Sequence, residues 1–578
     1  MWNKTGLYAA TVRVVLVTLL ATPAAIHAHS SDASGLLAPG ELRSAGAVEF
    51  PISCKPDVQA EFNRAVALLH SFFYEEARNF FGRIAEQDRE CAMAHWGVAQ
   101  SWWHPIWTPP TPEEMAAGQA AAAKARALSA TPRERAFIDA INAYYDAPPP
   151  AADGPVGAGC HGPLGPRERV QAYEQAMRRA YDAFSEDVET QVFYAFAVLA
   201  LGYATPLDRT LARQKEAGAM LEVLWSRHRR HPGIAHYIIH SYDYPDLAGR
   251  ALPAAEAYAD IAPWVPHALH MPSHIFTRLG MWNEAIATNT ASAEASRSYA
   301  ALRQRTAAEV EELHALDYMM YSFLQQARDV EARRALDAVA AVRATFPELE
   351  FVGAYALAAM PARYALERNA WAEAAILPVP TRPQWARFPF VEGLFEYAHA
   401  LGRARTGDPD GARQALERMR ALRDATTEPR FDFFKKHLEL QMQAASAWIA
   451  QADGRSDEAL KLLRGTADAE DALGKHPVTP GALMPAREQL GDLLLGLRQP
   501  AEALAAYEAA LRTYPARFNA LYGAGLAAER LGDEALAHRY YTALVGQAHM
   551  ASATRAELTH ARSYLAAKPV AVTAADVR

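Results

Sequence analysis

The sequence predicts an all-α protein, an α-solenoid of helical hairpins, on three observations. Ala, Leu, Glu and Arg dominate the 578 residues, and these are strong helix formers, whereas β-branched residues are sparse. A short phrase recurs, in which turn residues and an acidic residue precede Glu-Ala or a close variant at the start of an amphipathic run. In its last two occurrences, Ala503 and Ala535 lie 32 residues apart, close to the length of one repeated helix pair.

The recurring phrase marks the turn between the two helices of each pair. It occurs at 74–81, 279–286, 328–336, 368–376, 406–416, 454–463, 498–507 and 531–541. With this phrase the chain resembles the tetratricopeptide repeat (TPR) family, most clearly over 485–545 and also over 266–465 and 56–145. The resemblance implies TPR-like hairpins stacked around a concave groove, in which a peptide or protein partner would bind.

The first 28 residues have the layout of a secretory signal peptide. Lys4 and Arg13 precede the apolar run 14–20, and small residues lead to a cleavage position after Ala28. We therefore expect an exported protein, periplasmic or secreted. An uncleaved anchor is the alternative, although the apolar run is shorter than the roughly 20 residues that a spanning helix needs. No later run reaches that length, so we expect no stable membrane span in the mature chain.

The net charge of −8 comes from interspersed charges of both signs. The chain therefore has no basic stripe for a phosphate backbone, and nucleic acid is not an expected partner.

The cysteines of the N-terminal helical repeats, 29–147, predict one disulfide. Cys54 precedes a helical pattern that begins near Pro56, and Cys91 follows the next helical pattern, which ends near Asp88. An antiparallel hairpin would bring both cysteines to the same end, so we expect a Cys54–Cys91 bridge in an oxidising compartment. Cys160 remains, in a Gly-Cys-His-Gly loop, either as a metal ligand or as an exposed bystander.

The Pro/Gly-rich loop 148–166 is the clearest predicted boundary. It separates the N-terminal repeats from central His-rich helical repeats, 167–345. A C-terminal TPR array, 346–568, follows. Shorter breaks are expected at 105–112, 378–389 and 476–485.

The central repeats hold an unusual concentration of histidine. Six of the 20 histidines of the chain lie within the 44 residues 231–274. His236 and His240 are four residues apart, as are His270 and His274, so each pair shares one helix face. The turn after Leu279 predicts one helix over 266–279, and the segment 233–243 is expected to be a helix that packs beside it.

We expect His236, His240, His270 and His274 to converge on one transition-metal ion. His267, Asp243 or His314 would complete or orient the site, and Asp317 is a further candidate. Neutral imidazole binds Cu, Zn or Fe, and exported location favours Cu or Zn. Alternatively, the histidines only form hydrogen bonds at a crowded helix junction, although several such rings would leave buried nitrogens unpaired at a cost of about 1–3 kcal/mol each.

A second arrangement of histidines is similar to the two ligand triplets of the tyrosinase-like copper proteins. It would combine His70, His95 and His104 with His236, His240 and a downstream histidine. His104 is also expected to cap a group of aromatic side chains that consists of Trp96, Trp102, Trp103 and Trp107. This aromatic group is either part of the core or the wall of a ligand site.

Two functions remain open from the sequence. The motifs AHYIIHSYD (235–243) and HALHMPSHIF (267–276) resemble those of exported bacterial TPR proteins of unassigned activity, which implies that the histidines are a group feature. The chain has no His-Glu-x-x-His, nucleophile elbow, P-loop or dinucleotide-binding motif. It is therefore either a metal-binding protein or metalloenzyme of unknown reaction, or a non-enzymatic scaffold for a peptide or protein.

Overall fold

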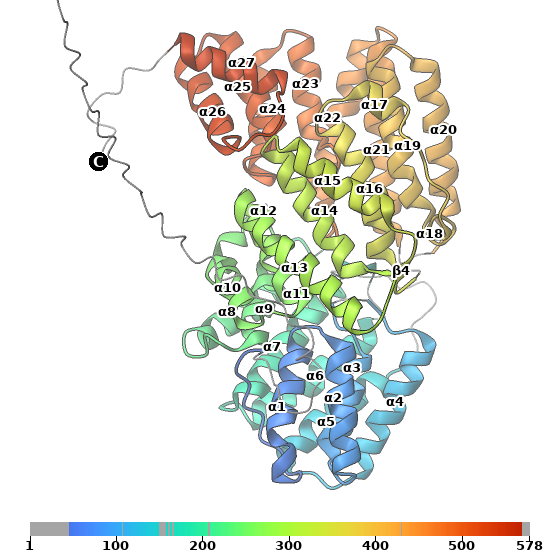
Figure 1. The fold of residues 1–578 in the computed structure, drawn as a ribbon, viewed down its shortest axis with the longest axis vertical. Helices are drawn as coiled ribbons and strands as arrows, with labels where there is room; N and C mark the ends of the chain where they lie inside the picture. The colour runs from blue at the N-terminus through green and yellow to red at the C-terminus, as the bar shows by residue number, and fades with distance from the viewer. Residues whose placement is uncertain are drawn as a thin grey trace, which may run out of the picture.

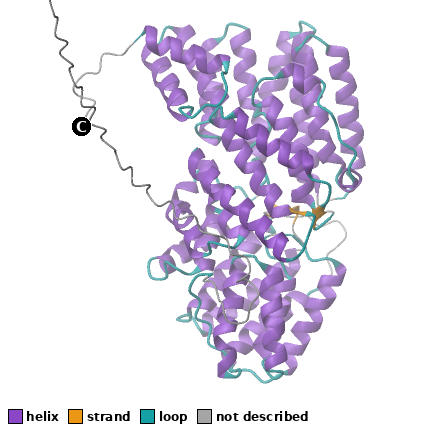
Figure 2. Ribbon diagram, in the orientation of Figure 1, coloured by secondary structure: helices purple, strands orange, loops and turns teal. Residues whose placement is uncertain are grey.

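The computed structural model shows the predicted all-α solenoid, with consecutive helices packed as antiparallel hairpins (Figures 1 and 2). It describes residues 45–106, 108–148, 158–159, 162–163, 167–205, 208–348, 350–428 and 431–568. The predicted signal segment and Cys160 lie outside these ranges. Among the described residues, no helix combines the length and the apolar character needed to cross a lipid bilayer.

The N-terminal array is the stack of hairpins that ends at Leu302. After a 3-10 turn, Pro56–Val58, its helices are α1 (Gln59–His70), α2 (Tyr74–Gln87), α3 (Ala92–Trp102), α4 (Pro112–Ala127), α5 (Pro132–Asp146), α6 (Arg167–Ala183), α7 (Val188–Tyr203), α8 (Ala212–Trp225), α9 (Pro232–Tyr242), α10 (Ala248–Ile261), α11 (Pro266–His270), α12 (Pro272–Leu279) and α13 (Trp282–Leu302).

The C-terminal array continues the same hairpin pattern. Its helices are α14 (Val310–Gln325), α15 (Asp329–Ala341), α16 (Phe351–Leu366), α17 (Trp371–Ala375), α18 (Pro383–Arg387), α19 (Pro389–Arg405), α20 (Pro409–Ala425), α21 (Asp432–Ala452), α22 (Ser456–Leu473), α23 (Ala486–Gly496), α24 (Pro500–Thr513), α25 (Phe518–Leu531), α26 (Glu534–Gln547) and α27 (Ala556–Ala567).

Each strand in the described part of the chain is two residues long, and the strands form two pairs. β1 (Ala158–Gly159) pairs antiparallel with β2 (Gly162–Pro163), and β3 (Ala308–Glu309) pairs parallel with β4 (Thr345–Phe346). Neither pair forms a core layer, so helix packing alone builds the fold.

Local sequence explains where several helices begin. Thr111 and Thr131 each form a capping box with the glutamate three residues later, and a proline follows each threonine. The threonine side chain and the glutamate together satisfy two backbone N–H groups that a helix start leaves without partners. These local signals set the residues at which α4 and α5 begin.

Each array turns back on itself. In the N-terminal array α1 packs against α9, although the two helices are about 170 residues apart in sequence. In the C-terminal array the start of α25 returns to α14, where the Phe518 backbone N–H donates to Gln325 Oε1 at 2.9 Å. This closure brings the first helices of distant hairpins together on the inside of each turn.

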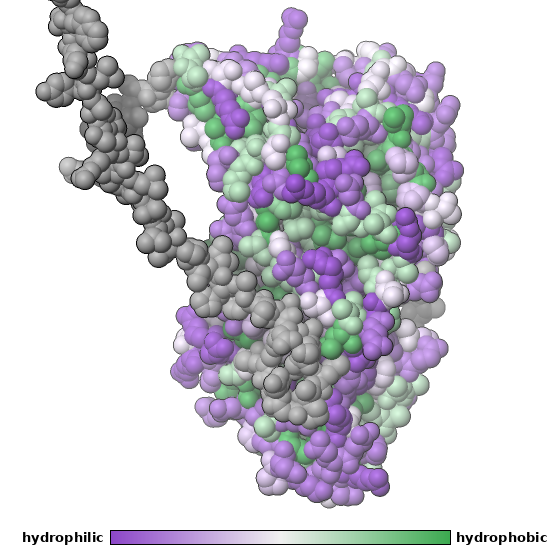
Figure 3. All heavy atoms as spheres, in the orientation of Figure 1, coloured by the Kyte–Doolittle hydropathy of each residue, from purple (hydrophilic) through white to green (hydrophobic). Residues whose placement is uncertain are grey.

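The hydrophobic core divides into two groups of residues, one in each array. One group runs from Ala45 to Ala285 and the other from Leu313 to Tyr564. The core therefore does not divide at the loop 148–166, and α5 and α6 pack directly together across that loop. On the face shown in Figure 3, hydrophilic and hydrophobic residues are interspersed.

Gly280 marks a contact between the arrays. It ends α12 in the left-handed conformation, with φ of 71°, and a Cβ there would lie 2.7 Å from Ala516 Cβ. Glycine is required here both for the backbone angle and for the close approach.

The predicted Cys54–Cys91 disulfide is present, with Cα atoms 4.9 Å apart. Replacing both cysteines by alanine is expected to lower the free energy of unfolding by roughly 3–4 kcal/mol, because the bridge closes a loop of 37 residues. Urea unfolding followed by circular dichroism measures this loss. A reducing agent should destabilise the wild type equally and leave the double variant unchanged; equal midpoints for oxidised wild type and variant would contradict the prediction.

The buried His476 side chain should make the stability of the C-terminal array sensitive to acid. Burial, with the charges of Lys475 and His437, lowers the pKa of His476 to about 3, and its Nδ1 accepts the Val478 backbone N–H at 3.1 Å. The unfolded chain, with a histidine pKa near 6.5, binds the proton more readily. The contribution of His476 to the free energy of unfolding is therefore complete above a pH of about 6.5. At lower pH it decreases by about 1.4 kcal/mol per pH unit.

The slope of unfolding free energy against pH tests this, in metal-free protein between pH 5 and 7. His476→Asn keeps an acceptor for Val478 and should remove about one proton from the slope. Replacement of exposed His549 by Asn serves as the control and should change nothing. An unchanged slope in His476→Asn would show that His476 is not the titrating group.

Candidate metal centre

The predicted histidines lie on the inner helices where the two arrays meet. His236 and His240 come from α9, His267 and His270 from α11, and His274 from α12 (Figure 1). His314 comes from α14, the first helix of the C-terminal array. Each of the six is at most 2% exposed.

The histidines form two neighbouring groups of three, which corrects the expectation of one four-histidine point. His236, His240 and His267 make the first triplet, and His270, His274 and His314 make the second. In each triplet one ligand atom from every residue lies within 4.8 Å of the others. The two triplets adjoin, since the rings of His267 and His270 have centroids 6.4 Å apart.

Two features of the chain separate the triplets. The predicted helix 266–279 is interrupted at Met271, because Pro272 lacks an N–H and its ring is incompatible with a continuous helix. The helix α10 also intervenes between α9 and α11, so α9 is not the direct hairpin partner that the sequence indicated. His267 thus faces α9, whereas His270 and His274, on either side of the break, face α14.

In the second triplet the hydrogen atoms of two rings are assigned by their neighbours. His270 Nδ1 lies 2.7 Å from Asn289 Oδ1, and the Asn289 amide nitrogen donates to the Ala285 carbonyl at 2.7 Å, which fixes the orientation of the amide. His270 Nδ1 must therefore carry the hydrogen. His274 Nδ1 donates to Asp243 Oδ2 at 3.0 Å. Both Nε2 atoms are left with lone pairs, and they lie 3.0 Å apart.

Asp243 orients the site and is not placed as a ligand. Its second oxygen accepts from Arg278 Nε at 2.8 Å, and Lys475 Nζ lies 3.9 Å from Oδ2. Burial opposes ionisation, but the charges of Lys475 and Arg278 and the His274 bond hold the pKa of Asp243 well below its usual range. An ionised carboxylate behind a histidine is the usual outer-shell partner of a metal ligand.

The first triplet has a similar but less completely assigned arrangement. His236 Nδ1 donates to the His70 carbonyl at 2.7 Å, so its Nε2 carries the lone pair. His240 Nε2 lies 3.0 Å from that atom, and the His267 ring centroid is 5.0 Å from that of His236. In this triplet a hydrogen bond from His240 Nε2–H to His236 Nε2 would satisfy the two nitrogens as well as a metal ion would.

These geometries fit a transition-metal ion. Two nitrogens bound at about 2.0–2.1 Å to one ion, at angles of about 90–110°, lie roughly 2.9–3.4 Å apart. A proton is a poor substitute between His270 and His274, because burial lowers the pKa of both rings, and the charge of His274 lowers that of His270 further. Two lone pairs 3.0 Å apart in the protein interior otherwise repel.

A third cluster, which the sequence did not indicate as a unit, lies behind the first triplet. Glu189 accepts from His70 Nε2 at 3.0 Å and from His231 Nε2 at 2.9 Å. His70 Nδ1 accepts from the Tyr237 hydroxyl at 2.9 Å, and His231 Nδ1 accepts the Ile234 N–H at 3.3 Å. Every ring nitrogen is used, so this cluster supports His236 through the His70 carbonyl rather than binding metal itself.

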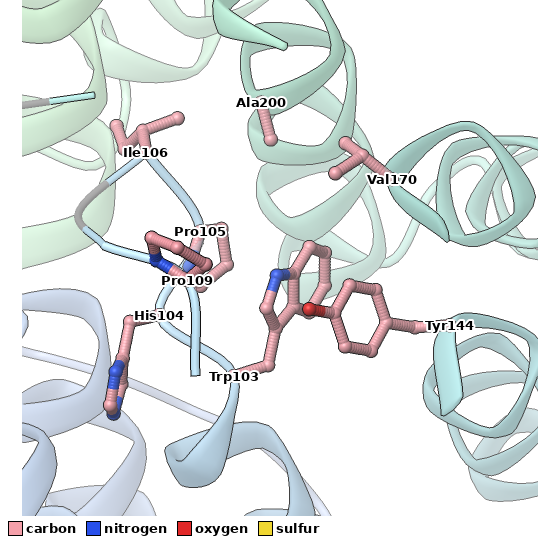
Figure 4. Close-up of a pocket in the computed structure, with 8 residues that line it drawn as sticks. All are labelled: Trp103, His104, Pro105, Ile106, Pro109, Tyr144, Val170 and Ala200. Atoms are coloured by element: carbon pink, nitrogen blue, oxygen red, sulfur yellow. The ribbon is translucent and has the colours of Figure 1, made fainter. Parts of the chain in front are cut away.

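The tyrosinase-like arrangement is not formed. His95 and His104 belong to none of the metal-ligating groups among the described residues. The Tyr74 ring lies 4.6 Å from that of His104, which points away from Trp103 in Figure 4. Asp317, the other candidate, binds Arg363 Nε at 3.2 Å.

The aromatic group is core where the structure describes it. Trp96 is fully buried among Phe50, Phe62, Phe137 and Phe193. Trp103 stacks on Tyr144 at 4.2 Å and lines a cavity of only about 10 Å³ (Figure 4). Trp102 is partly exposed beneath Arg78, and Trp107 lies outside the described residues.

No protein-family model and no curated protein matches this chain. Among solved structures, the crystal structure of the yeast Tom70 is similar over 88% of this chain and 95% of that chain, with 12% sequence identity and a TM-score of 0.31.

Proposed function

We propose that this protein is a transition-metal protein with two adjacent three-histidine sites. The second triplet carries the proposal, since His270 and His274 direct two lone pairs at one point and their outer nitrogens are committed to Asn289 and Asp243. His314 supplies the third imidazole. By analogy of donor type, His236, His240 and His267 hold the second ion.

The donor set favours copper or zinc over iron. All six proposed ligands are imidazoles, which suit both metals, and no cysteine lies in either triplet. Non-haem iron sites of the facial-triad kind use a carboxylate ligand, whereas both oxygens of Asp243 are engaged by His274, Arg278 and Lys475. Such an ion would supply Lewis-acid or redox chemistry, so the protein is a metalloenzyme or a metal carrier.

Elemental analysis of protein purified without a polyhistidine tag tests the proposal. The expected result is two equivalents of copper or zinc per chain after exposure to either metal and removal of the excess. Protein that retains none under these conditions would overturn the proposal. A scaffold that binds a peptide or protein in its concave groove would then be the function to test.

Asn289 offers a test that leaves all ligands in place. Asn289→Leu removes the acceptor for His270 Nδ1–H and is expected to weaken metal binding at the second triplet by about 10–100-fold. A competition titration against a chromophoric chelator measures this. Asn142→Leu is the matched control, since Asn142 is also buried and donates to the carbonyls of Ala122 and Ile138. Equal affinities in both variants would show that Asn289 does not orient a ligand.

A further inference from the structure

A cavity of about 600 Å³ lies where the two arrays face each other, beside the first triplet. Its wall comes from the turn before α2, from α11, α13 and α14, and from the start of α16. A volume of this size is within the range of small-molecule sites. Six phenylalanines contribute to the wall: Phe72, Phe73, Phe346, Phe351, Phe388 and Phe431. The cavity therefore favours a molecule with an apolar body.

Phe346 leaves apolar surface open to water at this cavity. It is 39% exposed, whereas Phe72, Phe351 and Phe388 are at most 5% exposed. A ligand that covers the Phe346 ring would remove apolar area from water, which favours binding.

The hydroxyl of Ser296 indicates one polar group on the ligand. Ser296 is 0% exposed and lines the cavity, one helical turn after Ser292, whose hydroxyl donates to the Pro266 carbonyl at 2.8 Å. Buried serines in helices often donate to the carbonyl one turn earlier, as Ser322 does to Tyr318 at 2.9 Å. The Ser296 hydroxyl has no hydrogen-bond partner among the described residues. A ligand hydroxyl or carbonyl in the cavity would supply that partner.

The acidic side chains next to α14 already have partners within the protein. Glu75 and Glu309 both pair with Arg305, at 2.8 Å and 2.9 Å. Glu311 Oε2 lies 3.6 Å from His267 Nδ1. A cationic ligand would have to compete with these partners.

The other two acids of the wall bind backbone N–H groups at helix starts. Glu350 Oε2 accepts the Val352 N–H at 2.8 Å, and Glu114 Oε2 accepts the Thr111 N–H at 2.8 Å in the capping box of α4. A carboxylate at this position is stabilised by the helix that it caps. Neither acid therefore needs a cation from a ligand.

The two arginines of the wall are also engaged. Arg78 donates to the Ser101 carbonyl at 3.2 Å and lies over the Trp102 ring at 3.7 Å. Arg387 pairs with Glu428 at 3.2 Å. An anionic ligand would meet these two guanidinium groups beside five carboxyl groups, and a cationic ligand would meet the guanidinium groups themselves. The wall therefore offers neither sign of charge a dedicated partner, and burying an unpaired charge is unfavourable.

His267 joins this cavity to the proposed metal site. It lines the cavity and belongs to the triplet with His236 and His240. The Phe72 ring stacks on His267, with centroids 5.5 Å apart, and also lines the cavity. A molecule in the cavity would therefore lie against a proposed metal ligand.

We propose that this cavity binds a small uncharged aromatic molecule that carries one hydroxyl or carbonyl group. The aromatic body packs on the phenylalanine rings, and the polar group forms a hydrogen bond with Ser296 Oγ. That the molecule is a substrate or effector of the metal centre rests on the function proposed above; that it binds does not.

Calorimetric titration of metal-free protein with four probes of similar shape tests the binding. The probes are 2-phenylethanol, ethylbenzene, 2-phenylethylamine and 3-phenylpropionate. We expect the alcohol to bind about 5-fold more tightly than ethylbenzene, because only the alcohol reaches the Ser296 hydroxyl with a polar group. It should bind at least about 10-fold more tightly than either ion. Absence of alcohol binding, or equal binding of the amine or the carboxylate, would overturn the proposal.

Replacing Ser296 by alanine assigns the polar contact. The alcohol should then bind no more tightly than ethylbenzene, and the affinity for ethylbenzene should not fall. The unliganded variant should be as stable as the wild type in urea, because no hydrogen bond is lost. Ser322→Ala is the matched control: it should lower stability and keep the preference for the alcohol, since Ser322 is buried, hydrogen-bonded and outside the cavity wall. A preference for the alcohol that survives Ser296→Ala would show that the assigned contact is wrong.

Replacing Phe346 by serine assigns the aromatic contact. The alcohol and ethylbenzene should both bind at least about 3-fold more weakly, because the variant loses apolar contact area with either probe. Ile376→Ser is the matched control, since Ile376 is 80% exposed and does not line the cavity. If the two variants bind the probes equally well, the aromatic body does not lie in this cavity.

Electron paramagnetic resonance of copper-loaded protein tests the link to the metal. Saturation with 2-phenylethanol should change the Cu(II) spectrum, because the bound molecule lies against His267. An unchanged spectrum with bound alcohol would refute the link while leaving the cavity site intact. Failure to load copper or zinc, with alcohol binding retained, would refute the metal proposal alone.

Discussion

Replacing His274 by alanine should remove one of the two metal ions per chain, and replacing His240 should remove the other. His274 provides one of the two lone pairs at the second triplet, and His240 lies 3.0 Å from His236 Nε2 in the first. The double variant should retain no metal. The remaining two imidazoles of each site would bind too weakly to survive removal of excess metal, since a stable protein site generally has three or more ligands.

Metal content, measured by elemental analysis beside a far-ultraviolet circular dichroism spectrum, checks this result. Helicity should change little, because the stability of a solenoid is spread over its repeats. His399→Ala is the matched control, a buried histidine of the C-terminal array whose Nε2 donates to the Leu377 carbonyl at 2.7 Å. The proposed ligand sets would be wrong if the double variant kept two ions, or if His399→Ala lost them.

Replacing Arg517 by methionine should produce a large loss of stability in the C-terminal array. The fully buried Arg517 side chain donates to Glu367 Oε1 at 2.7 Å and to Glu488 Oε2 at 2.6 Å. These contacts tie the start of α25 to the end of α16 and to α23. Burial raises the pKa of Glu488 to about 7, and the charge of Arg517 opposes this. Removing the guanidinium leaves the buried carboxyl groups of Glu367 and Glu488 without a positive partner. The expected decrease in the free energy of unfolding is about 3–5 kcal/mol.

Urea unfolding of metal-free protein measures this loss. The triple variant Arg517→Met, Glu367→Gln, Glu488→Gln should recover most of it, because no charge is then left buried. Arg464→Met, which removes an exposed ion pair with Glu502, is the surface control and should cost less than about 1 kcal/mol. If Arg517→Met cost no more than this control, closure of the C-terminal array would not depend on the buried charge network.

Local sequence determined the repeating units of this protein. The Glu-Ala phrase marked the turns of hairpins such as α1–α2 and α25–α26, and the capping threonines with their prolines marked the starts of α4 and α5, since these signals act within one or two helical turns. The Cys54–Cys91 bridge followed from the same local geometry, because one antiparallel hairpin is enough to juxtapose its two ends. Helical spacing also identified which histidines share a face.

Only the tertiary structure decided how those histidines are grouped and oriented. His70 and His236 are 166 residues apart and meet because small rotations between successive hairpins add up to a closed turn. No local periodicity encodes that sum, so neither the division into two triplets nor the cavity beside His267 followed from spacing. The hydrogen positions on His270 and His274 likewise depend on Asn289 and Asp243, which reach them from other helices. A sequence pattern places an imidazole on a helix face, whereas the neighbours across the fold decide which of its nitrogens is left to bind a metal.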